Sequence, residues 1–177
     1  MANATFLFNM PRFSSTVMNA LASNWRVSGI LRVESGMAFT VVSGTDRMLS
    51  GVNAGGQYVN QVSDDVYGNK CKDGLVGTNP SCLWLNASAF AVPQLGTLGT
   101  LGPTTVFGPG SWNVDTGLAR VFNLKETQKL EFRAEAKNVL NHANFGNPSG
   151  NLGSSQFGRI QSAGPGRVMQ FALKYLF

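Results

Sequence analysis

The stretch RVMQFALKYLF, residues 167–177, alternates between two kinds of side chain along most of its length. Large apolar side chains occupy every second position, and polar or small ones lie between them: Met169, Phe171, Leu173, Tyr175 and Phe177 against Gln170, Ala172 and Lys174. Successive side chains of a β-strand point to opposite faces of its sheet. The pattern therefore predicts a strand with one apolar and one polar face.

Four earlier segments show the same alternation, and two of them carry an exception. The predicted strands lie near residues 2–10, 24–36, 111–122, 128–140 and 167–177. Ile30 interrupts the polar face of the second segment, and Arg120 interrupts the apolar face of the third. Each segment has roughly the 9 to 11 residues that a tilted strand needs to cross a bilayer.

The segment QKLEFRAEAKNVL, residues 128–140, has a composition that suits a helix. Its apolar and charged residues nevertheless alternate almost completely: Leu130, Phe132, Ala134, Ala136 and Leu140 against Lys129, Glu131, Arg133, Glu135 and Lys137. A helix would spread these charges around much of its circumference and place some beside the apolar stripe. Because the pattern outweighs the propensity, we predict a strand.

The connections between these segments differ greatly in length. Residues 11–23 form a moderate connection and 123–127 a tight turn, whereas 44–110 and 141–166 are long and rich in Gly, Pro or Asn. Compact globular domains seldom carry connections of that length. Outer-membrane β-barrels have long loops outside the cell and short turns in the periplasm. We therefore predict that 44–110 and 141–166 are external loops and that the last strand ends in the periplasm.

Together these features predict an all-β fold: an antiparallel, up-and-down transmembrane β-barrel segment of about five strands with long external loops, in the bacterial outer membrane. Aromatic residues near the predicted strand ends agree with the girdles of such barrels: Trp25, Phe122, Tyr175 and Phe177 at the inner boundary and Trp112 at the outer one. A soluble β-sandwich is the alternative. Its compact form does not suit the long loops, nor the charges opposite the aromatic rows.

Composition and motifs exclude several other classes of function. Charged residues make up 13% of the chain, about half of the roughly 25% usual in soluble domains. The net charge of +5 comes from scattered Lys and Arg, so nucleic-acid binding is not expected. His142 has no catalytic partner at a motif spacing, and Asp64, Asp65 and Asp73 lack the spacing of a calcium loop. We expect no enzyme activity and no cofactor.

Two cysteines lie close together in a segment rich in Gly, Asn and Asp. Cys71 and Cys82 would form a short disulfide loop in an oxidising compartment. Two unpaired thiols in a reducing compartment are the alternative. A zinc site would need more Cys or His residues than this segment offers.

Several blocks of the sequence resemble known outer-membrane proteins. The end QFALKYLF resembles the signal that directs barrel assembly, through Gln170, Ala172, Tyr175 and Phe177. FRAEAKNVLNHANFGNP resembles the strand and loop before the last strand of TonB-dependent receptors, and more narrowly of the Oar-like receptors with a carboxypeptidase-regulatory-like domain. WRVSGILRVESGMAFTV, WLNASAFAVP and GPGSWNVDTGLARVFNL are similar to further blocks of that subfamily, in the same order.

The resemblance implies the wall and external loops of a receptor that imports a substrate such as a metal chelate or an oligosaccharide. Its implied partners are outer-membrane lipid, the barrel-assembly machinery, the remaining strands and plug of the receptor, and TonB only indirectly through that plug. The alternative is a structural or adhesive surface module without transport activity.

TonB-dependent receptors have about 22 strands around a plug, together with a short box that TonB grips. These parts do not fit into 177 residues, and the start MANATFLFNMPRF lacks the features of a secretory signal. We therefore expect residues 1–177 to be the C-terminal part of such a barrel, a fragment without plug and TonB box.

Charged side chains on the predicted polar faces would line the barrel lumen. This set comprises Arg26, Arg32, Glu34, Glu131, Arg133, Glu135, Lys137 and Lys174. We expect opposite charges on neighbouring strands to pair, and we hypothesise that the set holds the plug. A hydrated wall without a specific partner is the alternative.

Overall fold

The computed structural model describes residues 2–11, 14, 23–51, 56–69 and 83–177. They form two compact units, one comprising Met1–Glu34, Ser111–Asn144 and Pro165–Phe177 and the other Ser35–Gly110 and Phe145–Gly164. We call the first the sheet unit and the second the loop unit. Within the described ranges, no helix is long and apolar enough to cross a membrane.

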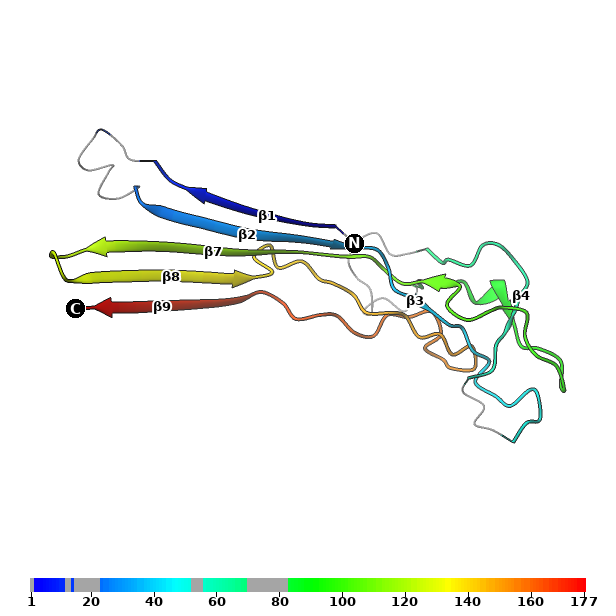
Figure 1. Ribbon diagram of the computed structural model, residues 1–177. Coiled ribbons are helices and arrows are strands. Elements are labelled where there is room, and N and C mark those ends of the chain that lie inside the picture. Colours follow the sequence, from blue (N-terminus) through cyan, green and yellow to red (C-terminus); the bar gives the residue numbers. More distant parts are fainter. Residues whose placement is uncertain (1, 12–13, 15–22, 52–55, 70–82) are drawn as a thin grey trace. The chain divides into compact units, whose positions relative to one another are not determined.

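The sheet unit is one antiparallel sheet in which each strand pairs with the strand before it in the unit (Figure 1). Its strands, in spatial order, are β1 (Ala2–Asn9), β2 (Trp25–Glu34), β7 (Ser111–Asn123), β8 (Lys129–Lys137) and β9 (Val168–Leu176). The predicted all-β, up-and-down fold is confirmed. The sheet is open, and β1 and β9 are its edges.

Strand β8 shows whether the alternation of apolar and charged residues or the helix-favouring composition decides the structure of this segment. Lys129–Lys137 is a strand that pairs with β7 on one side and β9 on the other. It ends before the predicted boundary at 140, because Asn138 has a φ of 50°. An L-residue with positive φ cannot continue a strand.

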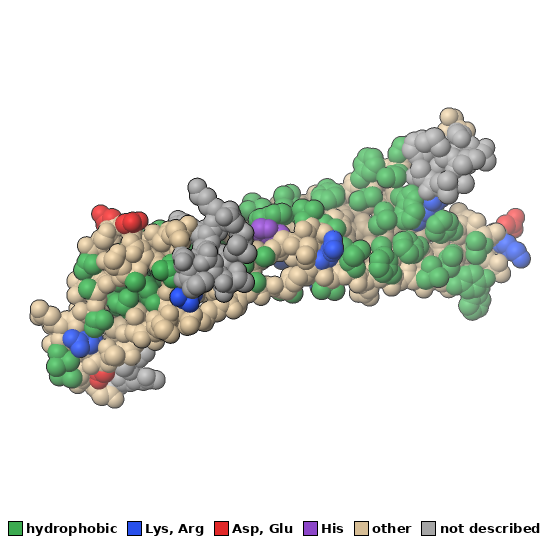
Figure 2. Space-filling view, turned by 180° about the vertical axis from the view of Figure 1, so that it is seen from behind, with side chains coloured by type: hydrophobic (Ala, Val, Ile, Leu, Met, Phe, Trp, Pro, Cys, Tyr) green, Lys and Arg blue, Asp and Glu red, His purple; other side chains and the backbone are tan. Residues whose placement is uncertain are grey.

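The strand register sorts the side chains into two faces that run across all five strands. One row joins Phe8, Val27, Leu118, Ala134 and Phe171, and the next joins Asn9, Arg26, Ala119, Arg133 and Ala172. We call the faces that contain these rows the apolar face and the polar face. Figure 2 shows hydrophobic side chains gathered over the strands. Exposed apolar surface of this extent is unusual for a protein surrounded by water.

The turn that follows β8 ties three strands together through Asn138, which is only 4% exposed. Its backbone N–H donates to Asp115 Oδ1 on β7 at 2.9 Å. Its side-chain Nδ2 donates to the carbonyls of His142 at 2.8 Å and Pro165 at 3.4 Å, and its Oδ1 accepts from the His142 N–H at 2.9 Å. The segment that enters β9 is thereby held at the end of β8.

We call the hydrogen bonds of Asn138 the clasp. Two further contacts extend it. Asn141 Oδ1 accepts from the backbone N–H of Arg167 at 2.9 Å, one residue before β9 begins. The His142 ring stacks on Trp112 with 4.1 Å between ring centroids. His142, in the loop after β8, is therefore partly covered by Trp112.

Most of the two long predicted connections, 44–110 and 141–166, belongs to the loop unit. It contains two small sheets, which pair β3 (Ala38–Phe39) with β6 (Val106–Phe107) and β4 (Asn60–Gln61) with β5 (Phe90–Ala91), and a short 3-10 helix η2 (Ala87–Ala89). Its buried core consists of Val41, Val59, Leu85, Ala89, Phe90, Leu101, Val106 and Phe157. These residues follow no period in the sequence, so no pattern signals their burial.

Both inserted segments contribute to this core. The Phe90 ring meets Phe157 edge to face, with 5.7 Å between ring centroids. The Val42 N–H donates to the Gly150 carbonyl at 2.9 Å, and the Trp84 N–H donates to the Gly158 carbonyl at 2.7 Å. The described residues of 35–110 and 145–164 therefore fold as one compact unit.

The clasp yields a test with a matched pair of substitutions. Asn138→Ala removes the side-chain hydrogen bonds and also opposes the positive φ, whereas Asn138→Gly removes the hydrogen bonds but accepts that φ. We expect Ala to destabilise the folded protein by about 2 kcal/mol or more and Gly by less. Outer-membrane samples are heated to a series of temperatures before electrophoresis. The readout is the temperature at which the faster-migrating band of the folded protein disappears. Equal behaviour of both variants and the parent would contradict the role of the clasp.

Candidate functional site

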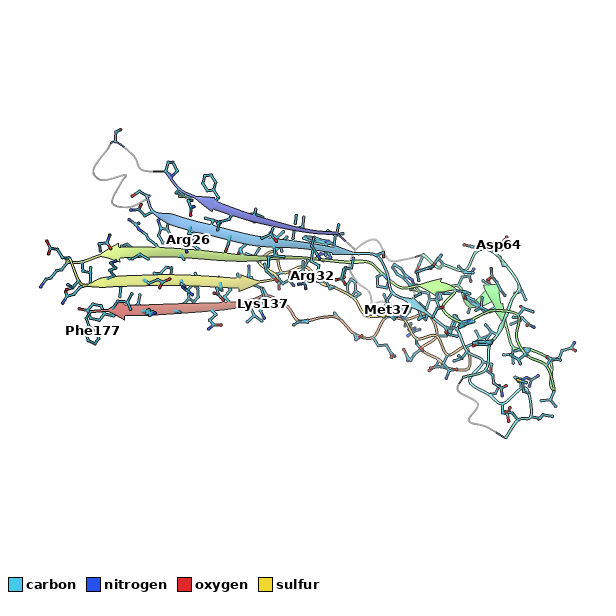
Figure 3. All side chains as sticks on the ribbon, viewed as in Figure 1. Arg26, Arg32, Met37, Asp64, Lys137 and Phe177 are labelled. Atoms are coloured by element: carbon cyan, nitrogen blue, oxygen red, sulfur yellow. The ribbon has the colours of Figure 1, made fainter. Side chains whose placement is uncertain are left out.

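The polar face of the sheet gathers the charged residues that the sequence singled out. Register places all of them on this one face: Arg26, Arg32, Glu34, Glu131, Arg133, Glu135, Lys137 and Lys174. Figure 3 shows Arg26 and Arg32 near opposite ends of β2 and Lys137 near one end of β8. The candidate site is therefore an extended charged wall.

The pairing of these charges differs from the expectation. Along β8 the polar face reads Lys129, Glu131, Arg133, Glu135 and Lys137, so the sign alternates at every step. Arg133 Nε lies 2.6 Å from Glu131 Oε1. We expected ion pairs between neighbouring strands, but the pair found in the described part of the chain joins two residues of one strand. Glu131 is thus paired within β8, and Lys174 lies opposite it on β9.

Small residues on β7 make room for the long side chains beside them. Gly117 and Ala119 form the floor of a hollow of about 210 Å³, with Arg26 and Arg133 at its sides. A second hollow, of about 300 Å³, lies further along the face between Ile30 and Lys137. Both hollows lie on the polar face.

The family follows from comparison with known proteins. The family model for the outer membrane beta barrel domain matches residues 1–170. The chain belongs to this β-barrel family. A bacterial outer-membrane location follows from this membership. No curated protein matches the chain, and no solved structure does so.

Membership in this β-barrel family indicates which environment each face of the sheet contacts. In outer-membrane barrels the apolar side chains point outward to lipid and the polar ones point into the lumen. We therefore expect Phe8, Val27, Leu118 and Phe171 to contact lipid and the charged wall to face the lumen. The predicted lumen-facing residues all lie on the polar face.

Arg120 is the charged exception on the apolar face of this barrel, and its contacts explain how it is tolerated. Its side chain is only 7% exposed. The guanidinium carbon lies 5.2 Å from the centroid of the Trp25 ring and 4.5 Å from that of Phe122. An aromatic face attracts a cation, and its bulk shields the charge from lipid. The sequence signal was an arginine in an apolar row with aromatic residues nearby.

Gln170, Ala172 and Tyr175, which resemble part of an assembly signal, lie on the edge strand β9, and Phe177 follows its last residue. Gln170 and Ala172 belong to the polar face, and Tyr175 lies on the apolar face opposite Leu130. The rings of Tyr175 and Phe177 stack with 6.0 Å between centroids, and Phe177 is 95% exposed. The aromatic end of the chain and the outer edge of β9 are both exposed in the described structure.

The remaining candidates from the sequence carry no site in the described ranges. Cys71 and Cys82, with Asp73, lie outside the described residues, so the disulfide stays a prediction. Asp64 and Asp65 are exposed, and the described residues contain no group of three or more metal-ligating side chains.

A polar cluster that the sequence did not signal organises residues 46–51 of the loop unit. Asp46 Oδ1 accepts from the Gln57 side-chain amide and from the Ser50 N–H, and its Oδ2 accepts from the Gly51 N–H at 2.9 Å. The Gln57 hydrogen bond, followed by those from Gly51 and Ser50, holds the pKa of Asp46 below its ordinary value of 3.8. The ionised carboxylate therefore stabilises this loop.

The shielding of Arg120 predicts an energetic coupling. Trp25→Leu uncovers the guanidinium, so we expect it to destabilise the folded barrel more in the parent than in an Arg120→Leu background. The expected coupling energy is about 0.5–2 kcal/mol. A double-mutant cycle on the unfolding of the folded band measures it. If the effects of the two substitutions on stability simply add, the prediction that Trp25 shields Arg120 is wrong.

The Asp46 cluster predicts a pH dependence with a defined sign. Because the folded pKa is depressed, its stabilisation is fully present above the ordinary value of 3.8 and is lost as the pH falls through the lower folded pKa. We expect the hydrogen-exchange protection of the Ser50 and Gly51 amides, corrected for intrinsic rates, to be constant from neutral pH to about 4 and to fall below it. Asp46→Asn should lower the protection at neutral pH and remove this dependence.

Proposed function

We propose that this β-barrel chain forms the wall and external loops of a TonB-dependent receptor that imports a substrate such as a metal chelate or an oligosaccharide. The proposal assigns no enzymatic step to the chain. Its substrate would bind outside the cell, and TonB would act on the receptor's plug rather than on this sheet. The sequence blocks that resemble Oar-like receptors support the proposal.

The observation that carries the proposal is the loop unit. The segments that form it leave and re-enter the sheet at the same end, after β2 and β8 and before β7 and β9. The opposite end carries the short turn 124–128, closed by the Leu124 N–H donating to the Gln128 carbonyl at 2.9 Å. A loop unit with a folded core offers a preorganised surface for a ligand.

The open sheet edges support a larger assembly around these strands. Unpaired backbone groups are not tolerated in lipid, and about eight strands is the smallest barrel observed. The edges β1 and β9 would therefore pair with the remaining strands of the receptor, and the assembly machinery would engage β9. The plug would lie against the charged polar face.

Transport is tested by uptake in the native host. Cells that lack the gene and cells that lack TonB are compared with the parent for accumulation of radiolabelled ferric chelates and oligosaccharides. We expect one substrate to lose its accumulation in both deletion strains, because import needs both the receptor and its energy source. Unchanged accumulation of every substrate would contradict a transport role.

A second function is favoured by the exposed apolar side chains of the loop unit. Met37, Leu49, Val62 and Leu95 are all exposed there. Such residues suit an adhesive or structural surface module that contacts other cells or matrix. In that case deletion of the gene would reduce attachment to surfaces and leave accumulation of the substrates unchanged.

A further inference from the structure

Two arginines lie at the margins of the apolar face, one toward each end of the strands. Arg120 lies near the end of β7, where the rings of two aromatic residues cover it. Arg167 lies at the opposite end of the sheet, one residue before β9 begins, and it is exposed. Met169 and Phe171 lie on the apolar face of β9, and Arg167 continues this series of alternate residues. The two charges therefore have different surroundings, and that of Arg167 is open to another molecule.

The clasp holds Arg167 close to a stacked pair of rings. Asn141 Oδ1 accepts from the Arg167 N–H at 2.9 Å, and His142 is the next residue after Asn141. The His142 ring stacks on Trp112, with 4.1 Å between ring centroids and 25° between the ring planes. Trp112 lies opposite Val33 on the apolar face, and Figure 2 shows the one histidine of the chain with hydrophobic side chains beside it. We call Arg167, His142 and Trp112 the boundary cluster.

The charge of Arg167 is not offset on its own face. Within the described strands, every acid lies on the polar face: Glu34, Asp115, Glu131 and Glu135. Asp115 accepts from the Asn138 N–H of the clasp, but it lines a hollow of the polar face together with Lys137. Arg167 Nη1 donates to the Val139 carbonyl at 3.4 Å, and the described residues contain no ion pair to Arg167.

The boundary cluster lies at the depth of lipid headgroups. The 9 residues of β9 cross roughly 23 Å at about 3.3 Å per residue and a tilt of about 40°. The apolar band of an outer-membrane barrel is about 25 Å tall, so Arg167 lies at one margin of it. The long connections leave the sheet at this end, and such connections face the outside of the cell.

The chemistry of the boundary cluster suits a phosphorylated sugar that carries acyl chains. A guanidinium binds phosphate through two parallel N–H groups, and an indole prefers the boundary between headgroups and hydrocarbon. The outer leaflet of the bacterial outer membrane consists largely of a glycolipid whose sugars carry phosphates. A zwitterionic phospholipid fits less well, because it has a cation beside its phosphate that Arg167 would repel.

We infer that the boundary cluster binds the phosphorylated headgroup of an outer-leaflet glycolipid. The Arg167 guanidinium binds the phosphate, the His142 ring donates to a sugar hydroxyl, and Trp112 packs against the upper part of an acyl chain. Asn141 positions Arg167 through its backbone N–H. The inference concerns the lipid-facing surface of the barrel, so it holds whether or not the receptor imports a substrate.

The lipid that stays on the protein tests the boundary cluster. Full-length protein is extracted from native outer membranes in a mild detergent, and the bound glycolipid is measured by native mass spectrometry. Arg167→Gln should lower the bound glycolipid about fivefold, which corresponds to about 1 kcal/mol, because it removes the charge but keeps the N–H that bonds Asn141. Lys137→Gln is the matched control and should leave it unchanged, since Lys137 lies opposite Val168 at the same end but on the polar face. No loss in Arg167→Gln, or an equal loss in both variants, would overturn the inference.

A competition on the parent protein needs no variant and identifies the ligand. The full-length protein is placed in phosphatidylcholine vesicles that contain either the phosphorylated glycolipid or its dephosphorylated form, and is then extracted and measured in the same way. We expect the phosphorylated form to be retained and an excess of inorganic phosphate to leave it bound. Equal retention of the dephosphorylated form, displacement by inorganic phosphate, or retention of phosphatidylcholine in place of the glycolipid would each overturn the inference.

Discussion

The sheet depends on one constraint: every backbone N–H and C=O group of a strand in lipid must bond to a neighbouring strand. This constraint favours the up-and-down order of β1, β2, β7, β8 and β9, because each new strand then pairs with the one just formed. It also fixes the two faces, since paired residues point to the same side. Alternation along each strand thereby becomes one continuous apolar surface and one continuous polar surface.

The exceptions to this alternation are where the chain adds something to a plain barrel wall. Arg120 is a charge on the apolar face, and the rings of Trp25 and Phe122 cover it within the same sheet. Leu7, Ile30 and Val121 are the opposite case, apolar side chains on the polar face.

Outside the strands, the chain meets a different requirement. Residues in water can bond to solvent, so a long connection needs a core of its own to hold one shape. The loop unit obtains that core by combining two segments far apart in the sequence, through contacts such as Phe90 with Phe157. Asn138 and Asn141, just after β8, are hydrogen-bonded to Pro165 and Arg167, just before β9. A surface that is fixed in this way suits recognition better than free loops would.

The sequence by itself determined the five strands, their two faces and the order of long and short connections. It could do so because period-two alternation is a local property, which even decided β8 against its helical composition. It did not reveal the core of the loop unit, the cover over Arg120 or the pairing of Glu131 with Arg133. Those features depend on which residues meet across strands and across long separations in the chain. Only the tertiary structure decided them, because register and long-range packing, rather than local pattern, bring the side chains together.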